Sequence, residues 1–184
     1  MILTDREIIS AISNKQISIT PPPSPTAYSS TSVDLMLARQ IRLWNQIVRG
    51  TEVTVCPGDP SYSYERVAKA YTTPIEIPNE GYTLEPGHFL LGWTIENVDF
   101  PCHSRICARV EGKSSLARLG ISIHQTAPII HAGFKGPIQL EISHNGVLPV
   151  KLIVGMPICQ LILEQTFGTP DKGYKGQFYE QSVG

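Results

Sequence analysis

The chain has 184 residues, of which 41% are hydrophobic and 17% charged, and its 15 Lys and Arg against 16 Asp and Glu give a formal net charge of −1. This length predicts a single domain, residues 1–184, with its own hydrophobic core, and the composition argues against intrinsic disorder. The even charge argues against a nucleic-acid partner, because duplex binding needs surplus cations to displace counterions from phosphates. A compact polyanionic ligand needs only a few local cations and stays compatible.

The sequence also predicts a cytoplasmic protein with no membrane partner. No stretch approaches the roughly 18 consecutive apolar residues of a membrane span. The first twelve residues include Asp5 and Glu7 and contain no hydrophobic signal core. The four cysteines form no CxxC pair, so we expect them to be reduced.

Residues 1–30 predict a short helix followed by a proline-rich arm. Thr4 and Glu7 have the spacing of a capping box, which predicts a helix over residues 4–13. The prolines that follow, Pro21–Pro23 and Pro25, predict an exposed, extended connection. A surface arm is the simpler interpretation, and an arm that crosses onto a neighbouring subunit is the other.

The rest of the chain predicts many short strands. Alternating apolar residues predict a strand over 32–44, and a polar and turn-rich segment follows over 50–73. Residues 166–184 have little apolar periodicity, and we expect them to form a flexible tail. Further strands are expected over 74–78, 82–101, 105–112, 120–130, 136–144, 149–154 and 158–165. The 15 Gly and 15 Pro that separate them favour a mainly β fold, a β-barrel or jelly roll, with one helical turn at 114–120.

The segment EGKSSLARLG, residues 111–120, contains several groups that can bind a phosphate. Lys113, Ser114, Ser115 and Arg118 combine two cations and two hydroxyls with the free N–H groups of a helical turn. The spacing is not that of a Walker loop. A capped helix start with a solvated basic face explains the same string equally well.

Glu141 is the acidic residue that is the clearest candidate for a catalytic role. It lies between Leu140 and Ile142, and alternation places Gln139 and Ser143 on its side of the strand. Upstream, Gly133 and Gly136 bracket Phe134 and Lys135, as in a hairpin with a bulge. Alone, Glu141 fits a solvent-facing position better, but in a pocket it could serve as a general base.

The histidines and cysteines do not predict a metal site. His124, His131 and His144 lack the spacing of a tight ligand motif. Zinc-dependent nucleobase deaminases require His-x-Glu before Pro-Cys-x-x-Cys, whereas here Pro101-Cys102 has no second cysteine at the required place. We therefore expect no zinc.

Several ordered motifs together resemble one family. The chain contains LTDREIISAI before the proline arm, SVDLMLA, EGKSSLARLG, TAPIIHAGFKGPIQLEI, LPVKLIVGMPICQL and the tail string GYKGQ. In this order they are similar to the dCTP deaminase family, within the superfamily of trimeric dUTPases. The resemblance implies a dUTPase-like distorted β-barrel or jelly roll, a homotrimer with active sites between subunits, and deamination of dCTP to dUTP and ammonia. It also implies Mg²⁺ bound through the substrate triphosphate, a role in pyrimidine deoxynucleotide supply, and dTTP as an inhibitor.

Carried over by position, the resemblance implies a role for each site residue. Glu141 is the general base, and the Ser114 hydroxyl and the Ala127 carbonyl hold the attacking water. His124 occupies the position of a regulatory, switching histidine. The implied substrate-binding residues are Lys113, Ser115, Arg118, Phe134, Gln139, Lys172, Tyr174, Lys175 and Gln177.

His131 departs from the related enzymes that also release pyrophosphate, which carry an aspartate at that position. A histidine cannot act as the same permanent anion. We therefore expect deamination with little dUTP pyrophosphatase activity. The alternatives are a bifunctional dCTP deaminase and dUTP pyrophosphatase, or a non-catalytic nucleotide-binding regulator.

Overall fold

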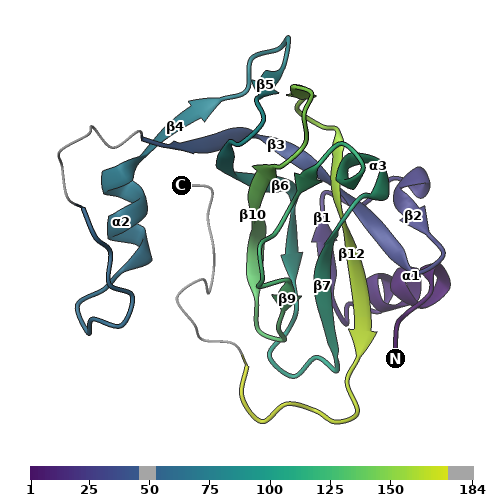
Figure 1. Ribbon diagram of the computed structural model, residues 1–184. Helices are drawn as coiled ribbons and strands as arrows, with labels where there is room; N and C mark the ends of the chain where they lie inside the picture. Colours follow the sequence, from purple (N-terminus) through teal and green to yellow (C-terminus); the bar gives the residue numbers. More distant parts are fainter. Residues whose placement is uncertain (46–52, 174–184) are drawn as a thin grey trace.

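The computed structural model describes residues 1–45 and 53–173, which form a mainly β structure around one curled sheet (Figure 1). The helices are α1 (Asp5–Ser13), the 3₁₀ turn η1 (Pro25–Ala27), α2 (Tyr64–Tyr71) and α3 (Ser114–Ala117). The strands are β1 (Ser18–Thr20), β2 (Tyr28–Ser29), β3 (Ser32–Trp44), β4 (Thr72–Glu76), β5 (Tyr82–Leu84), β6 (Phe89–Asp99), β7 (Ile106–Gly112), β8 (Ile121–Ser122), β9 (Ile129–Ile130), β10 (Lys135–His144), β11 (Val150–Leu152) and β12 (Pro157–Gln165). The predicted fold class is confirmed.

The sheet runs in the order β8-β10-β6-β3-β12-β7-β9, and its neighbours pair antiparallel. Strand β1 adds to β6, β2 and β4 add to β3, and β5 pairs separately with β11. The long strands β3 and β6 therefore form the centre of the structure, and β10 lies between β6 and β8. This position fixes the strand that carries Glu141 on both of its edges.

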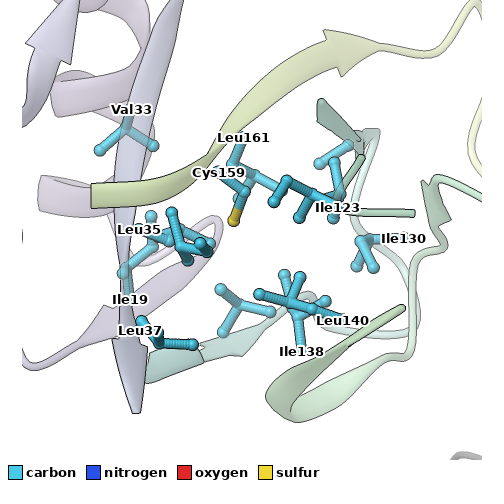
Figure 2. Packing of buried hydrophobic residues seen from close by; sticks show 14 of the residues in the cluster. Ile19, Val33, Leu35, Leu37, Ile123, Ile130, Ile138, Leu140, Cys159 and Leu161 are labelled. Carbon is cyan, nitrogen blue, oxygen red and sulfur yellow. The ribbon is translucent and has the colours of Figure 1, made fainter. Parts of the chain in front are cut away.

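The core lies on the concave side of this curled sheet. Along β3, Val33, Leu35 and Leu37 are fully buried at alternate positions, as expected of a strand with one face in the core. Figure 2 shows these side chains together with other apolar residues of the core. The labelled partners are Ile19, Ile123, Ile130, Ile138, Leu140, Cys159 and Leu161.

The first helix begins where the capping pattern predicts, but its cap uses a different bond. Thr4 is the extended residue before α1, yet its hydroxyl accepts no backbone N–H and instead donates to the carboxylate of Glu7. The arm after α1 is also less exposed than predicted. Ile19 is buried because β1 pairs with β6, and Ala27 is buried in η1, whereas Pro21 and Pro22 are exposed.

Two sequence expectations about the chain between strands were wrong. Residues 64–71, predicted as polar and irregular, form α2, whose Ser63 cap accepts a hydrogen bond from Arg66 N at 3.4 Å. An eight-residue helix with only Ala68 buried leaves too little apolar periodicity to be recognised. Residues 133–136, expected to form a hairpin, instead connect two strands that do not pair with each other. Strand β9 pairs with β7, whereas β10 pairs with β6 and β8.

No helix of the described chain is long and apolar enough to cross a membrane.

Glu96 is a buried carboxylate of the core, with only 4% of its surface exposed. Its Oε2 accepts the Met36 N–H at 2.9 Å, and its backbone carbonyl accepts the Thr94 hydroxyl at 2.8 Å. Burial raises the pKa of the Glu96 carboxyl, and the hydrogen bond from Met36 opposes this shift only in part. The folded protein therefore binds this proton more tightly than the unfolded chain does.

Glu96→Gln should make the protein less sensitive to rising pH. Because the pKa of Glu96 is raised in the folded state, its contribution to stability is present below the unfolded pKa and is lost as pH rises through the folded value. The melting temperature of the variant minus that of wild type should thus increase between about pH 4.5 and pH 8. Thermal unfolding across this range measures it, with Glu80→Gln, an exposed glutamate, as control. A pH-independent difference would contradict the assignment.

Candidate active site

A cavity of about 260 Å³ opens beside β10 and collects several residues that the sequence singled out. Its wall is otherwise aliphatic, with Val110 and Ile138 among the contributors. The residues of chemical interest are His124, Ala127, His131, Phe134, Gln139 and Glu141. A larger hollow of about 560 Å³ lies beside α1 and is lined by none of the predicted site residues. The smaller cavity is therefore the candidate site.

The Glu141 carboxylate lines this cavity. In β10, buried Leu140 and Ile142 alternate with partly exposed Gln139, Glu141 and Ser143, as the sequence predicted. Of the two alternatives for Glu141, a solvent-facing position or a pocket, the structure thus shows the pocket, in which the side chain is partly exposed.

The loop after β8 holds the Glu141 carboxylate in place. The Gln125 backbone N–H donates to Glu141 Oε2 at 2.9 Å, and the Gln125 side-chain amide donates to Ser143 Oγ at 3.1 Å. Ile123 O accepts the Glu141 N–H at 3.0 Å. The same loop contains Ala127, which lines the cavity together with Glu141.

Strand β10 has an irregularity just before Gln139 and Glu141. The register of β10 against β6 shifts between Pro137 and Gln139. At the shift, the Ile138 N–H donates to the hydroxyl of Thr94 at 2.9 Å, and this threonine is 1% exposed. The hydroxyl thus replaces a missing strand partner just before the two polar residues of the cavity.

The GKSSLAR segment forms the short helix α3 and lies outside this cavity. Ser114, Ser115 and Arg118 are exposed, and none of them lines the cavity of the same chain. Lys113 has a partner that the sequence did not reveal, because its Nζ lies 2.5 Å from Asp34 Oδ2.

Close backbone packing fixes the end of this turn. Gly120 has φ of +88°, and a Cβ at that position would come 2.2 Å from Gly146 N. Asn145 N also donates to Gly120 O at 2.8 Å. The residue after β10 therefore ties the α3 turn to the strand of Glu141, although the exposed side chains of α3 do not line the cavity.

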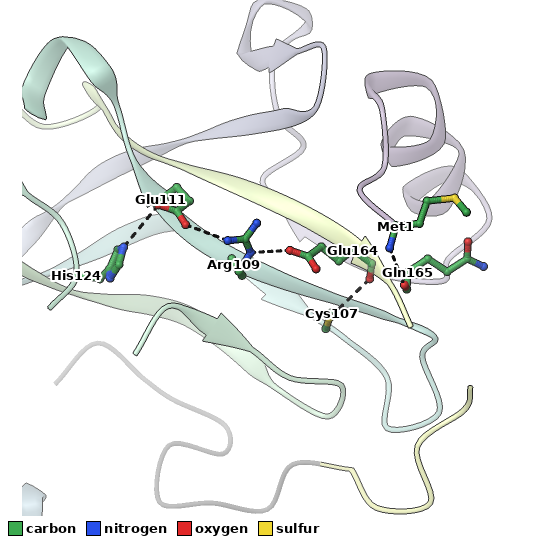
Figure 3. A network of polar contacts seen from close by, with 7 residues as sticks. All are labelled: Met1, Cys107, Arg109, Glu111, His124, Glu164 and Gln165. Atoms are coloured by element: carbon green, nitrogen blue, oxygen red, sulfur yellow. Dashed lines mark hydrogen bonds and ion pairs between the residues drawn. The ribbon is translucent and has the colours of Figure 1, made fainter. Parts of the chain in front are cut away.

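His124 connects the cavity to a line of charges on the outer face of β7 and β12 (Figure 3). Its Nε2 lies 3.8 Å from Glu111 Oε2, and Arg109 contacts Glu111 at 3.4 Å and Glu164 at 2.5 Å. His124 Nδ1 is buried without a hydrogen-bond partner within residues 1–45 and 53–173. Nε2 of His124 thus lies near Glu111, whereas its buried Nδ1 has no partner among the described residues.

The tail residues are described only in part. Lys172 is exposed, and Tyr174, Lys175 and Gln177 lie outside the described residues. A Cβ on Gly173 would come 2.7 Å from Cys102 Sγ, so this close approach of the tail depends on glycine. In the described ranges, no three His, Cys, Asp or Glu side chains are placed to hold a metal ion together.

Sequence reasoning missed one residue beside the cavity. Tyr64, the first residue of α2, donates its hydroxyl to Gln139 Oε1 at 3.2 Å. Burial raises the pKa of Tyr64, and the charge of Glu141 adds to that effect. Because α2 was not predicted, no pattern connected Tyr64 to a strand some 75 residues away.

Comparisons with known proteins identify the family. A family model described as dCTP deaminase-like matches residues 2–166. A protein of Tropheryma whipplei (strain Twist) named "dCTP deaminase, dUMP-forming" is 37% identical over 174 residues, which is 95% of this chain and 83% of that protein. One of the same name from Bifidobacterium longum (strain DJO10A) is 39% identical over 190 residues, 96% of this chain and 90% of that one.

Solved structures show the same fold. The 2′-deoxycytidine 5′-triphosphate deaminase from Agrobacterium tumefaciens superimposes with a TM-score of 0.67 at 22% identity, covering 89% of this chain and 48% of that one, so this chain spans about half its length. A dUTPase from phage phi11 of S. aureus gives a TM-score of 0.51 at 10% identity over 87% of this chain and 96% of that chain. With the family match over residues 2–166, these findings show that the chain belongs to the dCTP deaminase-like family.

Proposed function

We propose that this protein hydrolyses dCTP to dUTP and ammonia, with Glu141 as the general base. The observation that carries the proposal is the Glu141 carboxylate, which lines a cavity and is oriented by a backbone N–H from Gln125 at 2.9 Å. The names of the relatives, which are dCTP deaminases, support the reaction class.

The reaction needs one activated water and balanced proton transfers. Glu141 removes a proton from water, the resulting hydroxide attacks C4 of cytosine, and Glu141 delivers that proton to N3. The remaining hydroxyl proton then passes through Glu141 to the amine, which leaves as ammonia while the C4 carbonyl of uracil forms. The hydroxyl of Ser114 and the carbonyl of Ala127 hold the water in line for attack.

The triphosphate carries about four negative charges and requires cations. Lys113, Ser115 and Arg118 supply donors, Mg²⁺ enters through the phosphates, and Lys172 with Lys175 and Gln177 of the tail completes the set. Because α3 lies outside the Glu141 cavity of its own chain, we propose that a neighbouring subunit of a homotrimer brings its α3 to this cavity.

The remaining cavity residues fit the nucleoside. Phe134, 6% exposed, provides an apolar wall for the deoxyribose, and Gln139 provides an amide. His124 lies on the same wall and is the proposed element through which dTTP inhibits the enzyme. Its buried Nδ1 has no hydrogen-bond partner in the described part of the chain, so it could bond a ligand.

The product distinguishes two versions of this function. The relatives are named dUMP-forming, which favours an enzyme that also releases pyrophosphate. His131 favours dUTP as the final product, because Glu141 is the only carboxylate among the described residues that line the cavity. Attack on the α-phosphate would need a second water with its own base.

Glu141→Gln should abolish turnover and retain dCTP binding. The amide keeps the shape and the hydrogen bond from Gln125 but cannot accept a proton from water, so kcat should fall at least about 100-fold. Ammonia release measures turnover, and calorimetry should give a dCTP affinity within about threefold of wild type. Glu80→Gln, an exposed carboxylate, is the control. An active Glu141→Gln enzyme would remove Glu141 as the base.

Arg118→Ala should raise KM for dCTP at least about tenfold, because the phosphate charge loses a charge-assisted partner. Initial rates against dCTP concentration measure it, with Arg6→Ala on α1 as a control for loss of an exposed arginine. Equal effects of the two substitutions would exclude Arg118 from the phosphate site.

With dCTP and Mg²⁺, we expect dUTP and ammonia in equal amounts and little pyrophosphate, because His131 replaces the aspartate expected in a bifunctional enzyme. Chromatography of the nucleotides together with a pyrophosphate assay measures the products. His131→Asp tests whether the missing carboxylate suffices to start dUMP formation. Stoichiometric dUMP from the wild type would establish the dUMP-forming alternative.

A further inference from the structure

Tyr64 links helix α2 to the candidate active site through one hydrogen bond. Its hydroxyl donates to Gln139 Oε1 at 3.2 Å. Gln139 lines the cavity and shares a face of β10 with Glu141. A helix that is remote in sequence thus reaches a residue two positions from the base.

Helix α2 is capped at its start and tied to the central sheet at its end. At its start, the side chain of Ser63 accepts a hydrogen bond from Arg66 N. At its end, Thr72 is 4% exposed, and its hydroxyl donates to Ala68 O and accepts from Arg42 Nε at 2.8 Å. Arg42 belongs to β3, so the helix is tied directly to the central sheet.

The environment keeps the Tyr64 phenol protonated at neutral pH. Burial raises its pKa, and the nearby charge of Glu141 raises it further, whereas the bond to Gln139 lowers it. The hydroxyl is therefore a donor, and the oxygen of the Gln139 amide is its acceptor. Because this oxygen already accepts the Tyr64 hydroxyl, the amide N–H groups of Gln139 are the donors available to a ligand in the cavity.

We propose that Tyr64 is a positioning residue for the reaction: it fixes the Gln139 amide so that its N–H groups face the nucleotide beside Glu141. The proposal rests on the proposed function and adds a residue to it. An oriented donor favours a substrate group that accepts hydrogen bonds, such as the O2 carbonyl of cytosine. Without Tyr64 the amide could rotate or turn over, and the ordered donor would be lost.

Steady-state kinetics of Tyr64→Phe tests this role. The substitution keeps the ring and removes only the hydroxyl, so we expect KM for dCTP to rise about five- to tenfold while kcat changes less than threefold. The melting temperature should stay within two or three degrees of wild type, as for the control Tyr82→Phe. Tyr82 is a partly buried tyrosine whose pKa burial also raises, but it lies in β5 and does not line the cavity.

A double variant separates positioning from direct substrate contact. If Tyr64 acts through Gln139, then Tyr64→Phe should add no further increase in KM to a Gln139→Leu enzyme. Effects on KM that multiply, or a KM within twofold of wild type in Tyr64→Phe, would overturn the proposal.

A measurement without substrate separates this proposal from the proposed function. In the NMR titration of ring-labelled tyrosines, with Tyr64→Phe assigning the signal, Glu141→Gln should lower the pKa of Tyr64 and Gln139→Leu should raise it. Shifts in these directions support the coupled group even if dCTP is not the substrate. An unchanged Tyr64 titration in both variants would refute the coupling whatever the protein deaminates.

Discussion

The candidate site depends on one hydrogen bond, from the Gln125 backbone N–H to the Glu141 carboxylate. A glutamate on an open strand face would have many rotamers and full hydration, and neither favours a defined water as its partner. Here β10 carries Glu141, and the register of this strand against β6 shifts at Ile138. The loop after β8 orients the Glu141 carboxylate through Gln125. The cavity beside it is otherwise largely aliphatic, so the polar groups that remain can be selective.

Two further ionisable side chains, Glu96 and Lys113, have partners of their own. Glu96 is buried and receives the Met36 N–H, and Lys113 forms an ion pair with Asp34. The exposed turn α3, with Arg118 after it, is joined to the end of β10 through Asn145 and Gly120, yet it does not line the cavity of Glu141. This separation is the physical reason for proposing that the complete site combines two subunits, since a polyanion and a general base place opposite demands on local charge.

Much of this arrangement could be predicted from the sequence, and the failures have local causes. Alternation in PIQLEISH predicted that Gln139 and Glu141 share a face, because the period of a strand is independent of its partners. It could not show whether that face met solvent or a cavity, which depends on the loop that carries Gln125. Helix α2 was missed because its stability comes from its cap and from Arg42 rather than from apolar periodicity. The Asp34–Lys113 pair joins strand to turn across 79 positions, and no spacing rule reaches that far.

The most direct test of the central claim is a crystal structure of the Glu141→Gln variant with dCTP and Mg²⁺. We expect cytosine in the cavity beside Phe134, with one water between C4 and the side chain at position 141. The triphosphate should lie against Arg118 of a neighbouring subunit. A nucleotide bound in the hollow beside α1, or a base whose C4 is turned away from position 141, would contradict it.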